Sequence, residues 1–393
     1  MSKTLSAITA TAAESHSNYR ICPRCIMDTT DPEIRFDRDG VCHHCQDAER
    51  LFAVKWPLYK TGPFQIDRIT QAIKAAGKGK RYDCVIGVSG GVDSTYLAYV
   101  AHQHGLRPVA VHFDNGWNSE LAVKNIENTL HTLGIDLDTF VMDWEEFRDL
   151  QLSFLKASVP DLEVPTDHAI MAVLLQTAIR HDVRYILLGS NLATESILPR
   201  RWAYGFTDWR YIKAIHQRFG AVPLRRFPHY SLTRMAYYFG VRRLKTVSLL
   251  NSVEYTKARA MEVLLKELGW RNYGSKHHES IITKFLQTYI LPKKFNIDKR
   301  RAHLSSLIMS GQVTRAAALE EIKQAPYDEK TLKEDKIYVA KKFGLTEGEF
   351  DELMARPPRC YHDYPNSFHR LERLKQFRNL LQRCHFLPKQ VGW

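Results

Sequence analysis

The residues best suited to chemistry lie in one short stretch, Ser89-Gly90-Gly91-Val92-Asp93-Ser94. An apolar run precedes it and a helical pattern follows from about Thr95, so we expect a strand, a tight glycine turn and a helix N-terminus. Glycines let the backbone turn sharply, and free N–H groups at a helix N-terminus bind phosphate. Ser89 and Ser94 add hydroxyl donors, and Asp93 suits a Mg²⁺ ion held between carboxylate and phosphate. The stretch therefore predicts a nucleotide phosphate site.

This string is not a Walker A loop, because no lysine closes the turn. Ser-Gly-Gly-Val-Asp-Ser resembles the PP-loop of ATP pyrophosphatases, enzymes that cut ATP into AMP and pyrophosphate. The resemblance implies that ATP contacts seven consecutive residues: Val88, Ser89, Gly90, Gly91, Val92, Asp93 and Ser94. The alternative is a glycine turn that only packs a helix on a sheet.

Four cysteines near the N-terminus have the spacing of a metal site. Cys22/Cys25 and Cys42/Cys45 form two Cys-x2-Cys pairs with 16 residues between them. This spacing predicts a Cys₄ zinc ribbon, whose closed tetrahedral site stabilises structure and leaves no position for substrate. The alternatives are four unrelated thiols, or His43 or His44 in place of one thiolate.

The elements that must position these residues alternate between strands and helices. We expect strands at 82–88, 108–113, 137–142 and 184–188, and helices at 66–76, 93–104, 120–133, 144–157 and 166–181. This alternation predicts an α/β fold with a doubly wound parallel sheet, whose ligands bind at the carboxyl ends of the strands. The expected organisation is a mobile tail (1–18), the zinc ribbon (19–60), a PP-loop, HUP-like ATP pyrophosphatase domain (78–245) and a mostly helical substrate or partner domain (246–393).

Polar residues gather where these strands end. Resemblance to PP-loop proteins implies that His112, Phe113 and Asp114 border the nucleoside, whereas Asn115-Gly116 can also be read as a plain turn and Asp114 as a helix-entry residue. Asp167 opens a helix and is either a ligand or a cap. Gly189 permits close backbone approach to a ligand, and we place an active-site position there and at Asn191.

The block 274–319 holds the other candidates. Lys276 and Glu279 come where a helix begins, and we place Glu279 in its first turn, where it could also serve only to match the helix dipole. Five cations follow: Lys293, Lys294, Lys299, Arg300 and Arg301. They predict either a site for pyrophosphate or a diphosphate-linked substrate, with Lys294 and Arg300 as ligands, or a solvated helix face. The aromatic and basic stretch 200–245 can stack RNA bases, hold a nucleotide-linked sugar, or pack one domain on another.

Composition narrows the class of protein. The chain has 393 residues with a formal net charge of +13, which suggests an anionic partner. No apolar run approaches the ~20 residues needed to span a bilayer, and the first 18 residues lack a signal-peptide pattern. We therefore expect a cytoplasmic protein without membrane insertion. Seven cysteines, an odd number, argue against a disulfide scaffold.

Three motifs in order are similar to those of the N-acetyl sugar amidotransferase family of WbpG/PseA type: the cysteine ribbon, the PP-loop string and the block from His278 to Ser305. The resemblance implies that ATP activates an acetamido oxygen and that ammonia then displaces AMP, leaving an acetamidino group. It implies Mg²⁺ and ATP as cofactors and a nucleotide-sugar substrate, first of all a UDP-linked 2,3-diacetamido-2,3-dideoxy uronic acid, in lipopolysaccharide O-antigen synthesis. The catalytic residues it implies are Ser89, Asp93, Ser94, Lys276 and Glu279.

The proposed reaction needs ammonia, and the sequence shows no glutaminase motif that would supply it. The sequence begins Met1-Ser2 and contains no Gly-x-Cys-x-Gly elbow, so we expect no glutaminase of either common type within it. The family resemblance implies a separate glutaminase subunit and an ammonia-channelling cyclase-like subunit, without nucleic acid. Two alternatives remain open: a tRNA-modifying PP-loop enzyme of thiolation type, and a non-catalytic module that binds adenine nucleotides.

Overall fold

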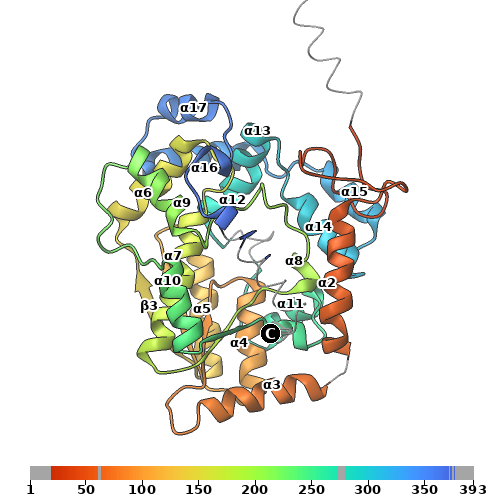
Figure 1. The fold of residues 1–393 in the computed structure, drawn as a ribbon, viewed down its shortest axis with the longest axis vertical. Helices are drawn as coiled ribbons and strands as arrows, with labels where there is room; N and C mark the ends of the chain where they lie inside the picture. Colours follow the sequence, from red (N-terminus) through yellow and green to blue (C-terminus); the bar gives the residue numbers. More distant parts are fainter. Residues whose placement is uncertain (1–18, 61–62, 273–278, 371, 374–375, 377–393) are drawn as a thin grey trace, which may run out of the picture.

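A five-stranded parallel sheet organises the molecule (Figure 1). The computed structural model describes residues 19–60, 63–272, 279–370, 372–373 and 376. The strands are β1 (Cys84–Gly87), β2 (Pro108–Asp114), β3 (Asp136–Val141), β4 (Tyr185–Leu187) and β5 (Lys245–Val247), in the order β3-β2-β1-β4-β5. The strand order reverses between β1 and β4, and such a switch point is where ligands of open α/β sheets bind. The predicted doubly wound fold is confirmed.

Helices connect and cover the strands. They are α2 (His43–Lys60), α3 (Pro63–Ala76), α4 (Val92–Gln103), α5 (Glu120–Leu133), α6 (Trp144–Ala157), α7 (Val164–Arg180), α8 (Leu192–Glu195), α9 (Trp209–Phe219), α10 (Leu232–Ala236), α11 (Lys257–Glu267), α12 (Ile281–Phe285), α13 (Leu291–Phe295), α14 (Arg300–Met309), α15 (Arg315–Lys323), α16 (Glu329–Phe343) and α17 (Glu347–Ala355). Single π-helical turns follow α10 (η2, Tyr237–Val241) and α12 (η4, Leu286–Ile290), and short 3-10 turns lie at η3 (Leu249–Ser252) and η5 (Tyr361–Asp363).

The two faces of the sheet bury separate cores. Alternate residues of a strand point to opposite faces, and β1 follows this rule: Cys84 and Ile86 pack with α3, α4, α5 and α11, whereas Val85 packs with α6, α7 and α9. Near-continuous burial along β1 and β2 is what a strand covered on both faces requires. The sheet is thus a rigid platform for the loops at its carboxyl edge.

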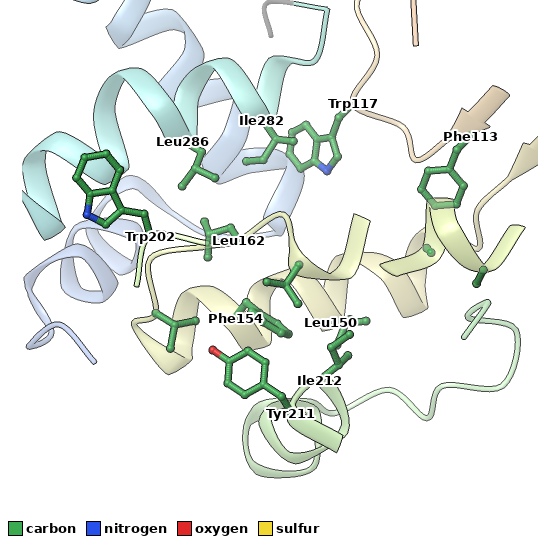
Figure 2. Close-up of a cluster of buried hydrophobic side chains, with 14 of the residues drawn as sticks. Phe113, Trp117, Leu150, Phe154, Leu162, Trp202, Tyr211, Ile212, Ile282 and Leu286 are labelled. Atoms are coloured by element: carbon green, nitrogen blue, oxygen red, sulfur yellow. The ribbon is translucent and has the colours of Figure 1, made fainter. Parts of the chain in front are cut away.

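The C-terminal helices share the core of the α6 face. Figure 2 shows Ile282 of α12 beside Trp117, and Phe154 of α6 beside Tyr211 of α9, with ring centroids of the latter pair 5.8 Å apart. The same buried cluster includes the ribbon cysteines and residues of α16 and α17. Strand β5 was not expected from the sequence. It crosses the boundary expected at 245/246, so the sheet continues to Val247, and α11 beyond it packs against α4.

Within the described part of the chain, no helix combines the length and the apolar character that crossing a bilayer requires.

Candidate active site

The four ribbon cysteines converge on one point. Their sulfurs lie within 4.8 Å of one another, and the Cys22–Cys45 and Cys25–Cys42 pairs are 3.9 and 3.7 Å apart. Four sulfurs placed ~2.3 Å from a zinc ion stand about 3.8 Å apart at the corners of a tetrahedron. The amides of Met27 and Cys42 donate to Cys25 Sγ and Cys22 Sγ. The buried donor set fits a structural zinc ion, as predicted.

His43 and His44 have other partners. His43 Nδ1 accepts the Arg35 amide, and His44 Nε2 lies 2.7 Å from Asp31 Oδ2. Neither ring belongs to the group of sulfur ligands, so the four-thiolate reading is the one that the geometry supports.

Side chains of the C-terminal region clasp the ribbon. Arg315 donates to the carbonyls of Cys22 and Cys25 from its Nε and Nη2 atoms. Arg301 on α14 pairs with the buried Asp28 at 3.1 Å and donates to Ile26 O, and the Ile26 amide donates to Ser305 Oγ. The ribbon is therefore anchored to α14 rather than held as a loose appendage.

The predicted phosphate loop joins β1 to α4 as expected. The hydroxyls of Ser89 and Ser94 are 3.1 Å apart, the Ser89 amide donates to Ser94 Oγ, and the Gly91 amide donates to Ser89 Oγ. Ser89 is exposed at the end of β1, whereas Gly90, Gly91 and Val92 are buried. Hydroxyl and amide donors thus gather at the N-terminus of α4, where the helix dipole favours an anion.

Three distant groups brace this loop, and the sequence analysis missed them. Gly90 has φ +78°, and a Cβ there would lie 2.4 Å from the carbonyl oxygen of Ala122. Close approach at Gly90 is therefore made to protein backbone, and contact between Gly90 and ATP stays a prediction. The indole N–H of Trp270 donates to Gly90 O at 2.9 Å, and the Tyr255 hydroxyl donates to Asp93 Oδ1. Burial, followed by the Asp93 carboxylate, raises the pKa of Tyr255, so the tyrosine keeps its proton and remains a donor.

A cavity of about 890 Å³ opens at the carboxyl ends of β1, β2 and β4. Val88 and Ser89 line it at the phosphate loop, and Gly189 lines it after β4. The opposite wall comes from the C-terminal region, including Glu279, Thr283 and His303. Both halves of the chain therefore line one cavity.

Hydrogen bonds join the two walls of the cavity just after the carboxyl end of β2. The Ser119 amide donates to Glu279 O and the Ile281 amide donates to Trp117 O, both at 2.9 Å. The Thr283 hydroxyl donates to Glu163 Oε1 at 2.6 Å, across from α12 to the start of α7. Helix α12 starts at Ile281 with Ser280 as its cap, so Glu279 precedes the first turn in which we had placed it. Lys276 lies outside the described residues.

Two of the three residues expected near the nucleoside line the cavity, and the third does not. His112 and Phe113 line the cavity; His112 Nδ1 contacts Val88 O at 3.2 Å, and Phe113 stacks on Phe140. Asp114 is not among the lining residues, and its carboxylate accepts from the Gly116 amide at 2.9 Å. Asp114 therefore stabilises the turn at Asn115-Gly116 that was the alternative interpretation, but it does not begin a helix, since Ser119 caps α5.

Asp167 faces the cavity from the first turn of α7. Burial first, and then the neighbouring carboxylates of Glu163 and Asp161, hold the pKa of Asp167 well above its ordinary range. Carboxyls perturbed in this way often mark functional sites. Glu163 and Glu195 line the same cavity, and the sequence analysis singled out neither.

The glycine and asparagine after β4 have different roles. A Cβ on Gly189 would lie 3.2 Å from the Ser94 amide nitrogen, so this glycine lets the end of β4 approach the start of α4. Asn191 is buried outside the lining and caps α8 by accepting the Thr194 amide. Asn191 therefore serves as a helix cap in this structure, and the ligand role expected for it stays a prediction.

The cationic cluster does not form a single site. Lys294 Nζ donates to the carbonyls of Leu353, Met354 and Arg356, which end α17, and burial lowers the Lys294 pKa to about 8. Arg300 lines the cavity, but its guanidinium pairs with Asp298 and donates to carbonyls at the end of α15. Lys299 also lines the cavity. The expectation of a joint phosphate site at Lys294 and Arg300 is therefore wrong for Lys294, which is bound elsewhere.

Two protein-family models match different parts of the chain. Residues 279–376 match the family of LPS biosynthesis protein WbpG-like, C-terminal domain. Residues 83–177 match Queuosine biosynthesis protein QueC, a PP-loop family. No curated protein matches the chain. Among solved structures, a predicted subunit of tRNA methyltransferase from Methanocaldococcus jannaschii is 12% identical, with 47% of this chain and 76% of that chain covered at a TM-score of 0.27. The two family matches confirm the resemblance predicted from the motifs.

Proposed function

The chain joins a PP-loop domain to a WbpG-like C-terminal domain, and we propose that it is an ATP-dependent amidotransferase acting on a nucleotide-activated sugar. It would convert an N-acetyl group to an acetamidino group, with release of AMP and pyrophosphate. The proposed substrate is the UDP-linked diacetamido uronic acid, and the proposed setting is O-antigen synthesis.

The observation that carries this proposal is the shared cavity. Ser89, from the segment that matches the PP-loop family, lines the same space as Glu279, Thr283 and His303, from the segment that matches the WbpG-like family. An ATP-activating enzyme needs the nucleotide phosphates and the acceptor oxygen side by side. A volume of about 890 Å³ is within the usual range for small-molecule sites.

The chemistry follows from the poor leaving ability of an amide oxygen. The acetamido oxygen attacks the α-phosphorus of ATP, the bond from that phosphorus to pyrophosphate breaks, and an O-adenylyl imidate forms. Ammonia then adds to the imidate carbon, the carbon–oxygen bond breaks, and AMP leaves with the former amide oxygen. The hydroxyls of Ser89 and Ser94 and the N–H groups at the start of α4 would stabilise charge on the departing pyrophosphate.

Metal ions have two separate roles in this proposal. Carboxylate oxygens such as that of Asp93 are the donors that Mg²⁺ prefers, and Mg²⁺ bound with ATP supplies charge neutralisation at the phosphates. Zinc at Cys22, Cys25, Cys42 and Cys45 would hold structure only, because all four of its positions are taken by thiolates. Ammonia would come from a separate glutaminase through a cyclase-like subunit.

The test is a reconstituted reaction with the purified chain, ATP, Mg²⁺, ammonium and the candidate sugar nucleotide. We expect AMP and pyrophosphate to form only when both acceptor and ammonium are present, together with a sugar product in which NH replaces O by mass spectrometry. Ser89→Ala, at a residue that lines the cavity, should abolish most of this turnover, whereas Ser310→Ala, outside the lining, should not. Release of ADP and phosphate, or AMP formation that ignores the acceptor, would contradict the proposal.

The tRNA-thiolation alternative gains little support from the cysteines. Cys84 is fully buried in β1, and burial raises the pKa of its thiol. Such a thiol is a poor sulfur carrier, because the thiolate is the reactive form. Tight, salt-sensitive binding of tRNA would favour this alternative over the sugar reaction.

A further inference from the structure

One segment of the chain is basic and free of acidic residues. From Trp209 to Val253 the sequence contains no Asp or Glu and nine basic residues: Arg210, Lys213, Arg218, Arg225, Arg226, Arg234, Arg242, Arg243 and Lys245. The net charge of the whole chain is +13. Such a concentration of one sign creates a local field that attracts an anionic surface.

The middle of this segment is a helix that barely packs. We call Leu232–Val241, which comprises α10 and η2, the exposed helix (α10 in Figure 1). No residue of α10 is buried, and Tyr238 is the buried residue of η2. The helix is held mainly at its end, where the Leu244 amide donates to Tyr238 O and Arg242 pairs with Asp182.

Its exposed side chains are apolar as well as basic. Leu232 is 40% exposed and Val241 69% exposed, and Tyr237 and Phe239 are also exposed. Arg234 and Arg243 lie exposed beside them. Large apolar side chains gathered in ten residues of a solvent-facing helix indicate a binding surface, whereas single exposed ones need no explanation.

The kind of partner follows from the side chains. RNA would be bound by arginines and stacked on aromatic rings, but Leu232 and Val241 cannot stack a base. A lipid surface uses both classes: aliphatic and aromatic side chains enter the acyl boundary, while arginines meet anionic headgroups. We propose that the exposed helix docks the protein peripherally on an anionic membrane surface.

This surface is separate from the cavity. Among the described residues, the cavity lining includes none between Leu198 and Lys257. Docking would therefore leave the mouth of the active site to its substrates, and the proposal stands or falls independently of the proposed amidotransferase reaction.

The first test is sedimentation of the full chain with vesicles of phosphatidylcholine alone and of equimolar phosphatidylcholine and phosphatidylglycerol. We expect binding to the mixed vesicles only, weakening as salt rises. The double variant Leu232→Ser/Val241→Ser should lower the partition coefficient at least about tenfold. Burial of a single aliphatic side chain in the membrane already contributes about that factor to binding. The matched control Leu265→Ser/Val123→Ser removes an exposed leucine and an exposed valine elsewhere and should bind as the parent does.

A second pair of variants tests the charges. Arg234→Gln/Arg243→Gln should weaken vesicle binding and flatten its salt dependence, whereas Arg35→Gln/Arg38→Gln on the ribbon should not. Equal binding to both vesicle types would overturn the proposal, as would vesicle binding that Leu232→Ser/Val241→Ser leaves intact. Two other results would also overturn it: RNA binding that depends on the arginines but not on Leu232 and Val241, or a dimer in solution that this variant dissociates.

Discussion

The cysteine ribbon and the phosphate loop are both read from short motifs, but they depend on the rest of the chain to different degrees. The ribbon has its four sulfurs and their amide donors within residues 22–45. The phosphate loop is braced by Ala122, Tyr255 and Trp270, which lie far along the chain. A metal motif is therefore nearly complete in itself, whereas a phosphate motif needs partners that only the fold supplies.

The largest effect should come from breaking the ribbon. Cys45→Ser removes one of four ligands, and structural zinc in small domains contributes on the order of 10 kcal/mol to folding. We expect loss of bound zinc by elemental analysis and faster hydrogen exchange in α14, which contacts the ribbon through Arg301 and Ser305. Cys360→Ser, half-buried and outside the ribbon, is the control. Full zinc content in Cys45→Ser would show that the site is not a four-thiolate one.

The next largest effect should come from the brace at Ala122. Gly90→Ala places a Cβ 2.4 Å from Ala122 O, so the loop must shift and its donors leave their positions. We expect the rate of AMP formation to fall about 100-fold, the cost of losing one well-placed donor. Gly79→Ala is a close match, since Gly79 has φ +77° and open space around its Cβ. If both variants lost the same activity, backbone strain alone would explain the result.

A smaller effect is expected at Trp270. Trp270→Phe removes the donor to Gly90 O and leaves that buried carbonyl short of a partner, at a cost of ~1–3 kcal/mol. We expect the KM for ATP to rise about tenfold, for which ~1.4 kcal/mol suffices. The buried indole N–H of Trp202 has no hydrogen-bond partner within the described structure, so Trp202→Phe removes a similar ring without breaking a bond. An unchanged KM in Trp270→Phe would show that the indole does not hold the loop.

The smallest effect should appear in the pH dependence of stability. The pKa of Asp167 is raised in the folded state, so its contribution to stability is present below the ordinary value of 3.8 and is lost as pH rises. Asp167→Asn should therefore gain in Tm relative to the parent as the pH rises above 3.8. Asp182 gives the opposite sign, because its hydrogen bond with Lys80 lowers the Asp182 pKa.

Asp182→Asn should accordingly lose Tm relative to the parent at neutral pH, and the gap should close as pH falls. Asp182 is exposed, so its effect should be the weaker of the two. Thermal melts of both variants across this range check the pair. Parallel shifts in the same direction would contradict the assigned pKa directions.

The regular elements were the most predictable part of the fold. Helices α5 and α6 begin and end at the expected residues, because Ser119 and Asp143 cap them and Gly134 ends α5 in the left-handed conformation. Strand β5 was missed, since three residues show no periodicity and its place is set by pairing with β4. Local signals therefore define helices better than they define an edge strand.

The site was most predictable where strands end. Ser89 and Gly189 follow β1 and β4, His112 lies near the end of β2, and all three reach the cavity as expected. Glu163 and Glu195 reach it through tertiary packing, and no motif marks them. The cations at 293–301 are neighbours in sequence, yet the fold sends Lys294 to α17 and Arg301 to the ribbon. Adjacent charges in a sequence do not establish a common target.

Helix α14 contacts three other parts of the protein. It meets the ribbon through Arg301 and Ser305, it receives the Ile197 amide at Ser306, and it presents His303 to the cavity while contacting Thr194 O. The four-thiolate site thus shares one helix with the wall of the cavity. With zinc bound there as we propose, zinc supply would set how much of the protein is competent, without any contact between zinc and substrate.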